Sequence, residues 1–278
     1  MLRTRVITAV GLLVLIVGIL AWGGSAGWGA FVLLVMGLGF WEWGRFAGLD
    51  AGDQKAFAIV AAIILLIAHQ ALPFMQTSAL LFTLSGLFWA AMVPKVLKDV
   101  GSGWLGKPLP HLAVAVVLLS AAGAAMLVAR ERGIVFLLSL LALVWVADVG
   151  AYFVGKSIGK RKLAPRISPG KSWEGAIGGA VLVIAYGWGC VLVAKSHPEL
   201  ASNWPAALQA KWHPVLFTGW MAIFAALSVC GDLFESLLKR RIGLKDSSNL
   251  LPGHGGVLDR IDAQLPVLPL GILVLGAV

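Results

Sequence analysis

The sequence predicts an all-α, polytopic membrane protein with about nine transmembrane helices and a cytoplasmic N-terminus. Apolar residues make up 59% of the 278 positions, the mean hydropathy is +0.91, and only 13% of residues are charged. A soluble chain of this length could not bury so much apolar surface. Apolar windows of about 17–22 residues, the length that crosses a bilayer, recur along almost the whole chain.

The expected spans follow one another with short connections. Arg3 and Arg5 precede the first span, but its apolar stretch is longer than that of a signal peptide and another span follows at once, so we expect a retained helix. The last span begins at a carboxylate and contains Pro266 and Pro269, which predicts a kinked start. The nine spans are 6–22, 26–41, 56–73, 77–94, 111–129, 133–154, 174–194, 214–236 and 262–278.

The distribution of Lys and Arg predicts the orientation. With the N-terminus inside, 18 of the 22 Lys and Arg residues fall on the inner side, as the positive-inside rule requires. The net charge of +9 therefore indicates membrane anchoring and anionic substrates. Because no basic helix with interleaved aromatic residues occurs, nucleic acid is not an expected partner. Cys190 and Cys230 lie in apolar spans without disulfide or metal spacing.

Three carboxylates gather at one predicted membrane boundary. Asp259 and Asp262 are three residues apart, so a helix that had begun there would carry both on one face. Asp232 ends the apolar run AALSVCGD. Such a group suits Mg²⁺, a hard cation that prefers oxygen ligands and substrate phosphates. The alternative is that Asp259 forms a salt bridge with Arg260 or Lys245.

Asp148 is the one charged residue of its predicted span. Acidic residues inside membranes usually have a function, although a structural ion pair with Lys or Arg is the alternative.

Two predicted cytoplasmic loops, 237–261 and 155–173, are rich in Lys and Arg. The second basic loop, with its flanking residues 155–175, contains six Lys or Arg residues, four glycines and two prolines. Glycine amides can approach a phosphate and lysines can neutralise it. The GKS at 170–172 is not a Walker A loop, because Pro165 stands where that motif has glycine and no buried strand precedes it. An ordinary cytoplasmic loop is the alternative to a phosphate-binding loop.

Residues 236–262, SLLKRRIGLKDSSNLLPGHGGVLDRID, resemble the signature of the phosphatidate cytidylyltransferase family, the CDP-diacylglycerol synthases. The segments ISPGKSWEG and DVGAY, and WEW at 41–43, resemble further motifs of that family. The resemblance implies an N-terminal helical region, 1–110, and a catalytic membrane region, 111–278, with cytoplasmic loops at 155–173 and 237–261.

The resemblance also implies roles for individual residues. The expected metal ligands are Asp232, Asp259 and Asp262, which would be catalytic together with Lys245, Asp246 and His254. His254 could donate to a phosphate or act in acid–base chemistry, or it could cap its own turn. The expected substrate-binding residues are Asp148, Lys156, Ser168, Lys171, Ser172, Glu174, Ser236, Lys239, Arg240 and Arg260.

The implied reaction transfers the cytidylyl group of CTP to phosphatidic acid, giving CDP-diacylglycerol and pyrophosphate for phospholipid synthesis. Mg²⁺ is the expected cofactor, and a second cation and a homodimer are left open. The expected location is the bacterial inner membrane, with the site facing the cytoplasm. Two alternatives stay open: a CTP-dependent polyprenol or dolichol kinase, and a cation-coupled transporter that uses the same acids as ion ligands.

Overall fold

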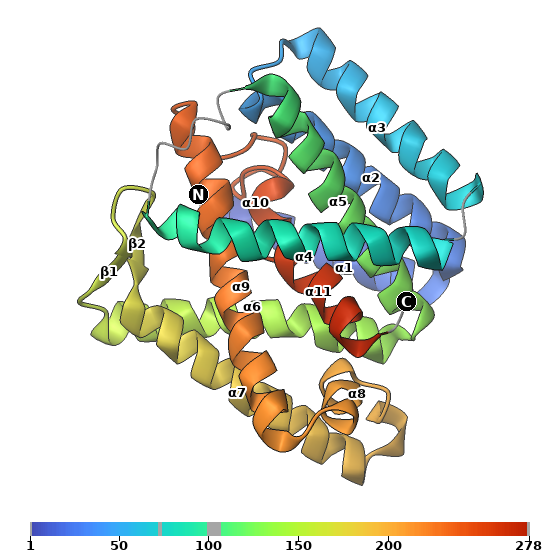
Figure 1. The fold of residues 1–278 in the computed structure, drawn as a ribbon, viewed down its shortest axis with the longest axis vertical. Helices are drawn as coiled ribbons and strands as arrows, with labels where there is room; N and C mark the ends of the chain where they lie inside the picture. Colours follow the sequence, from blue (N-terminus) through green and yellow to red (C-terminus); the bar gives the residue numbers. More distant parts are fainter. Residues whose placement is uncertain (1, 72–73, 99–106, 277–278) are drawn as a thin grey trace.

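The structure is a computed structural model that describes residues 2–71, 74–98 and 107–276 (Figure 1). Helices account for nearly all of it. The long helices are α1 (Leu2–Trp22), α2 (Gly24–Phe46), α3 (Ala51–Ala71), α4 (Phe74–Lys98), α5 (Pro108–Glu131), α6 (Ile134–Ile158), α7 (Trp173–Ser196) and α9 (Pro214–Arg241). The shorter elements are β1 (Lys162–Ala164), β2 (Ser168–Ser172), the 3₁₀ turn η2 (Pro198–Leu200), α8 (Trp204–Lys211), α10 (Leu258–Ile261) and α11 (Gln264–Leu275).

A helix corresponds to each of the nine predicted spans, and the predicted class of all-α polytopic membrane protein is confirmed. Within the described ranges, five helices are long and apolar enough to cross a bilayer, namely α2, α5, α6, α7 and α9. Shorter apolar stretches lie in α1, α4 and α11.

Large apolar side chains point outward along these helices. Val14 on α1, Leu87 on α4 and Leu192 on α7 are each more than 60% exposed. Exposing such an apolar surface to water is energetically unfavourable, whereas contact with lipid chains is not. The exposed faces therefore agree with a membrane environment.

The last predicted span differs from the observed segment. Residues 258–261 form the short helix α10, and α11 begins only at Gln264. Asp262 therefore lies between the two helices, outside the apolar segment, and not at the start of one continuous helix.

The second basic loop contains a feature that the sequence did not predict. Strands β1 and β2 pair in antiparallel fashion, with Lys162 opposite Ser172 and Ala164 opposite Ser168. The hairpin ends at Ser172, whose hydroxyl accepts a hydrogen bond from the Gly175 amide at 3.2 Å and caps α7. The basic loop is thus a folded arm joining α6 to α7.

Helices α6 and α7 pack very closely. A Cβ atom at Gly179 would lie 2.7 Å from the carbonyl oxygen of Ala147, so only glycine fits there. Small residues one turn apart allow such close approach in membrane proteins.

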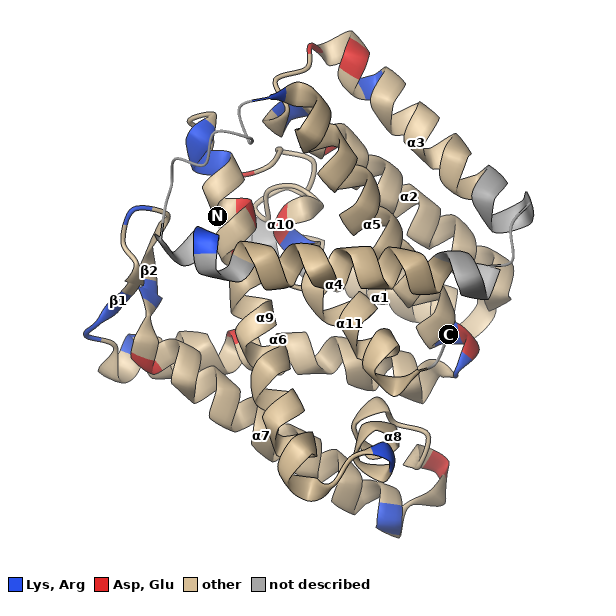
Figure 2. Ribbon diagram, in the orientation of Figure 1, with Lys and Arg blue, Asp and Glu red and all other residues tan. Residues whose placement is uncertain are grey.

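An aromatic group joins α9 to α2 and α4. The ring of Phe234 lies 6.2 Å from Trp43 and 5.5 Å from both Phe88 and Trp89, centroid to centroid. This contact holds the basic end of α9 beside the end of α2. Figure 2 shows that Lys and Arg gather at this end of α9 and on the β1–β2 hairpin, while the middles of the long helices carry few charges.

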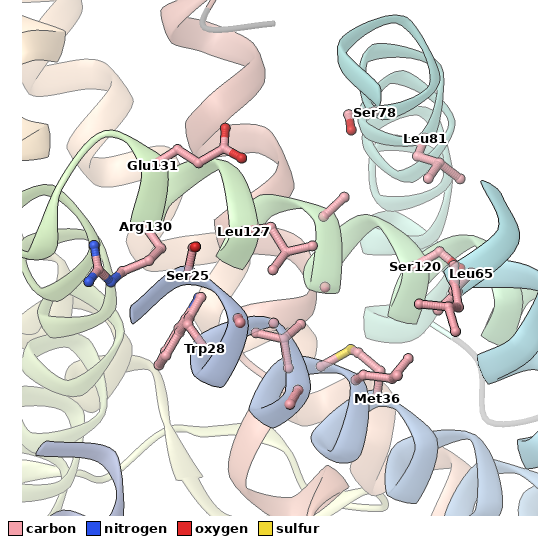
Figure 3. A pocket seen from close by; sticks show the side chains of 18 residues that line it. Ser25, Trp28, Met36, Leu65, Ser78, Leu81, Ser120, Leu127, Arg130 and Glu131 are labelled. Carbon is pink, nitrogen blue, oxygen red and sulfur yellow. The ribbon is translucent and has the colours of Figure 1, made fainter. Parts of the chain in front are cut away.

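A cavity of about 650 Å³ lies between α2 and α5, with contributions from α3 and α4 (Figure 3). Trp28, Met36 and Leu127 line it, and Arg130 and Glu131 lie at one end. None of the predicted site residues lines it, so it is separate from the charged cluster described next.

Candidate active site

Two carboxylates and a lysine form a buried chain between α9 and α10. Lys239 Nζ lies 2.5 Å from Asp259 Oδ1 and forms a second salt bridge with Glu235, one helical turn earlier on α9. Glu235 and Lys239 are buried. Because buried charges need partners, this arrangement ties the end of α9 to the start of α10.

Asp259 receives hydrogen bonds on both carboxylate oxygens. Besides Lys239, its donors are the Ser247 amide, the Ser247 hydroxyl and the Gly256 amide, each at 2.8 Å. Burial alone would raise the pKa of Asp259, but the Lys239 ammonium and the amide donors outweigh it and hold the pKa below its usual value. Asp259 is therefore an ionised group that organises the loop before α10.

A second carboxylate group lies nearby. A Cβ atom at Gly231 would overlap the carbonyl oxygen of Asp262 and lie 3.0 Å from Ala263 Cα, so glycine lets this segment lie directly on α9. Asp262 is thereby held beside Asp232, the next residue along α9.

Asp148 on α6 faces the same region. Its carboxylate accepts a hydrogen bond from the Ser228 hydroxyl at 3.4 Å. Burial raises the pKa of Asp262 to about 8, and the negative charges of Asp232 and Asp148 add to the rise. The three acids therefore interact electrostatically with one another, although they come from α6, α9 and the α10–α11 junction.

Lys171 supplies positive charge to this region from strand β2. Its Nζ lies 2.7 Å from Asp232 Oδ2, and Ser236 donates to Asp232 Oδ1 at 3.3 Å. The second basic loop and the α9 motif, about sixty positions apart in sequence, are thus brought together as one site.

The donor chemistry fits a hard divalent cation. Mg²⁺ is usually held by one or two carboxylates, with substrate phosphates and water completing the shell. Asp232 and Asp262 could be those two, whereas protein donors already surround Asp259. Within the described part of the chain, no three Asp, Glu, His or Cys residues form a ready-made ligand set, so substrate oxygens would have to complete it.

The other predicted residues of the basic arm make local contacts. Glu174 accepts hydrogen bonds from the Lys160 and Arg161 amides at 3.1 and 3.2 Å and so fixes the arm. Lys156 lies over the Tyr152 ring, 5.6 Å from its centroid. Ser168 begins β2 and Ser172 caps α7, so both residues have a role in the local fold of the arm.

Arg240 connects α9 to the arm. Its Nε donates to the Ile167 carbonyl at 3.4 Å, and its Nη1 donates to the Leu244 carbonyl at 3.2 Å.

The remaining predicted residues lie around the HGG turn. Arg260 Nε donates to the His254 carbonyl at 3.1 Å. Nδ1 of His254 is buried and has no hydrogen-bond partner within the described residues. Lys245 and Asp246 are exposed just before Ser247, where they can meet a ligand from outside the helices.

Sequence reasoning assigned no role to Glu42, Arg45 or Glu235. Glu42 lies on α2, is completely buried, and binds the loop before α10. Arg45 donates to the Ser247 carbonyl. Glu42 is an acid in the apolar run GLGFWEWG, and an acid within an apolar run is the same signal of function that Asp148 gives.

Comparison with known proteins identifies the family. A model described as the cytidylyltransferase family matches residues 3–278. A phosphatidate cytidylyltransferase of Pseudomonas aeruginosa is 38% identical over 272 residues, covering 97% of this chain and 95% of the relative. Proteins with the same name from Haemophilus influenzae and Brucella suis are each 36% identical, covering 84% and 94% of this chain and 84% and 88% of the relatives. The chain belongs to the cytidylyltransferase family.

Proposed function

We propose that this protein is a phosphatidate cytidylyltransferase, an enzyme that makes CDP-diacylglycerol from CTP and phosphatidic acid. Relatives with that name cover nearly the whole chain. The observation that carries the proposal is the Lys171–Asp232 pair beside Asp262 and Asp148. It combines anionic and cationic groups at the end of apolar helices, where a lipid phosphate and a nucleotide could meet.

The reaction requires charge neutralisation more than a strong base. A phosphomonoester is largely a dianion near neutral pH, since its second pKa is about 6. An oxygen of the phosphatidic acid phosphate attacks the α-phosphorus of CTP, the bond from that phosphorus to the β-phosphate oxygen breaks, and pyrophosphate leaves. The protein must therefore align three phosphates and the lipid phosphate and screen their repulsion.

Asp232 and Asp262 would hold Mg²⁺, which when bound would neutralise charge on the nucleotide phosphates. Asp148 would add negative charge behind them. Whether Asp259 also contacts the metal, as the family motif implies, and whether a second cation binds are further parts of this proposal.

The cationic groups would bind phosphate oxygens. Lys171 is the best placed, since a cation at Asp232 would release its ammonium toward a substrate phosphate. Arg260 on α10 and Lys245 in the loop before α10 are further candidates, as is His254. Lys239 already forms salt bridges with two carboxylates. Its role would therefore be to fix the position of Asp259, and not to bind a phosphate directly.

The protein would lie in the bacterial inner membrane, with this site at the cytoplasmic face where CTP is available. The uneven distribution of Lys and Arg supports this orientation, and bacterial relatives fit it. A homodimer stays a prediction, as does the division into regions 1–110 and 111–278.

The direct experiment is product analysis. Purified protein is incubated with CTP, phosphatidic acid and Mg²⁺, and the lipids are examined by mass spectrometry. We expect CDP-diacylglycerol together with an equal amount of pyrophosphate. A phosphorylated lipid alcohol with CDP would favour the kinase, and cation flux in vesicles without consumption of CTP would favour the transporter.

A further inference from the structure

A buried carboxylate on α2 holds the loop that precedes α10. Oε1 of Glu42 accepts hydrogen bonds from the Ser248 hydroxyl at 2.6 Å and the Val257 amide at 2.9 Å. Oε2 accepts from the Ser247 hydroxyl at 3.0 Å and the Leu258 amide at 2.7 Å. All these partners are more than 200 positions away in sequence, and the Glu42 side chain is completely buried.

The two amides belong to the beginning of α10. The first N–H groups of a helix have no acceptor within the helix, and a carboxylate is the favoured partner there. Here the carboxylate comes from a different helix, so Glu42 fixes where α10 starts. Asp259 and Arg260 lie on that helix, and Asp262 follows it directly.

The second glycine of the HGG turn is explained by the same contact. A Cβ atom at Gly256 would overlap both the Glu42 carboxylate and the Ser247 hydroxyl. The backbone can approach Glu42 only because that side chain is absent. Close packing against Glu42 therefore explains why position 256 is glycine without any contact to substrate.

Ser247 couples Glu42 to Asp259. Its hydroxyl lies 3.0 Å from Glu42 Oε2 and 2.8 Å from Asp259 Oδ2. One hydroxyl hydrogen can satisfy one of the two carboxylates at a time. Arg45, one turn after Glu42, donates to the Ser247 carbonyl, so α2 binds this end of the loop twice.

We propose that Glu42 is a positioning residue for the cytidylyl transfer: it holds residues 247–258 so that Asp262 stays beside Asp232 and Arg260 faces the phosphates. This inference rests on the proposed function. Glu42 itself would not touch substrate, because its oxygens are enclosed by the four donors named above. Its effect would be on the alignment of the reacting groups, where a displacement of about 1 Å can cost about 10²-fold in rate.

The test compares Glu42→Gln with Glu199→Gln, an exposed glutamate in η2. The first measurement is hydrogen–deuterium exchange of the detergent-purified proteins, which does not depend on any activity. We expect faster exchange in peptides covering 247–262 in Glu42→Gln, wild-type exchange elsewhere, and no change in Glu199→Gln.

The second measurement is kinetic. We expect Glu42→Gln to lower the kcat of the folded protein about 10²-fold, while the KM for CTP changes little. The midpoint of thermal unfolding should also fall, because an amide nitrogen would face buried N–H donors. A purely structural role predicts loss of folded protein with normal turnover of the remainder. Turnover within threefold of wild type in a variant whose loop exchanges faster would overturn the positioning role.

A milder variant covers the case in which Glu42→Gln does not fold. Ser248→Ala removes one donor to Glu42 without touching Asp259, and we expect partial loosening of the same peptides and a smaller fall in kcat. Wild-type exchange and kcat in Ser248→Ala would then overturn the inference. If the wild-type protein makes no CDP-diacylglycerol, the proposed function fails, but the exchange experiment still tests whether Glu42 holds the loop.

Discussion

Asp259 has four protein donors within hydrogen-bonding distance of its oxygens, whereas Asp232 and Asp262 each have fewer. These three acids thus have different surroundings. A carboxylate that binds a cation or substrate needs accessible oxygens. A carboxylate that organises a loop needs oxygens that already accept hydrogen bonds from the protein. This difference predicts different consequences of the same substitution.

Asp262→Asn and Asp232→Asn should each lose about 10³-fold or more in turnover, because in the proposed site each substitution removes a carboxylate that would hold Mg²⁺. Their thermal unfolding should stay near that of wild type. Asp259→Asn should lose activity and also about 1–3 kcal/mol of stability, since an amide nitrogen would face the N–H donors that now bind a carboxylate. Turnover assays at saturating Mg²⁺ and thermal unfolding distinguish the cases. Near-wild-type turnover in both Asp232→Asn and Asp262→Asn would remove the metal assignment.

Lys171→Ala should raise the KM for CTP or phosphatidic acid and lower kcat, because the ammonium next to Asp232 is lost. Lys195→Ala, an equal change of charge at the exposed end of α7, should behave like wild type. Steady-state kinetics on the two variants make the comparison. Equal effects would mean that the arm contributes charge for topology alone.

At the scale of elements, the contact between α9 and the α10–α11 junction is the most sensitive one. Gly231→Ala should displace Asp262 from Asp232, since the new methyl group would overlap the Asp262 carbonyl oxygen. We expect about 10²-fold loss of kcat. Gly219→Ala in the same helix has open space around the new methyl group and should keep full activity with slightly higher stability. If both variants are fully active, the close approach at Gly231 does not matter for the reaction.

The sequence predicted the helices well because their apolar windows are long. It predicted less where local pattern is weak. The hairpin at 162–172 has a three-residue strand and a second strand containing proline and glycine, which shows no alternation of apolar residues. The helix of span 214–236 continues to Arg241, because its basic end suits a helix C-terminus.

The site was only partly predictable for a different reason. Neighbouring motif residues such as Asp259 and Asp262 are found from spacing. The contacts of Glu42 with the loop before α10 join positions more than 200 residues apart, and the pairing of Lys171 with Asp232 joins different elements. No local pattern specifies such contacts, since they depend on how the helices pack.

At the scale of the whole molecule, the charges predict which face meets the cytoplasm. A cysteine at Asn249, exposed in the loop before α10, should react with a membrane-impermeant thiol reagent only in inverted vesicles. A cysteine at Ser202, in the exposed loop after α7, should react in right-side-out vesicles. Cys190 and Cys230 would first be replaced. Reaction of Asn249→Cys from the outside would place the site away from CTP and contradict the predicted number of spans.

We expect the group formed by Asp232, Asp262, Asp148 and Lys171 to carry out the transfer of the cytidylyl group to a lipid phosphate. The most direct measurement follows phosphorus labels from CTP into lipid, with purified wild-type protein and with Asp262→Asn. Label at the α-phosphate should enter the lipid, and label at the γ-phosphate should appear only in pyrophosphate. With Asp262→Asn, we expect neither label to enter the lipid. Entry of the γ-label into lipid, or unchanged transfer of the α-label by Asp262→Asn, would contradict this assignment of the reaction to these residues.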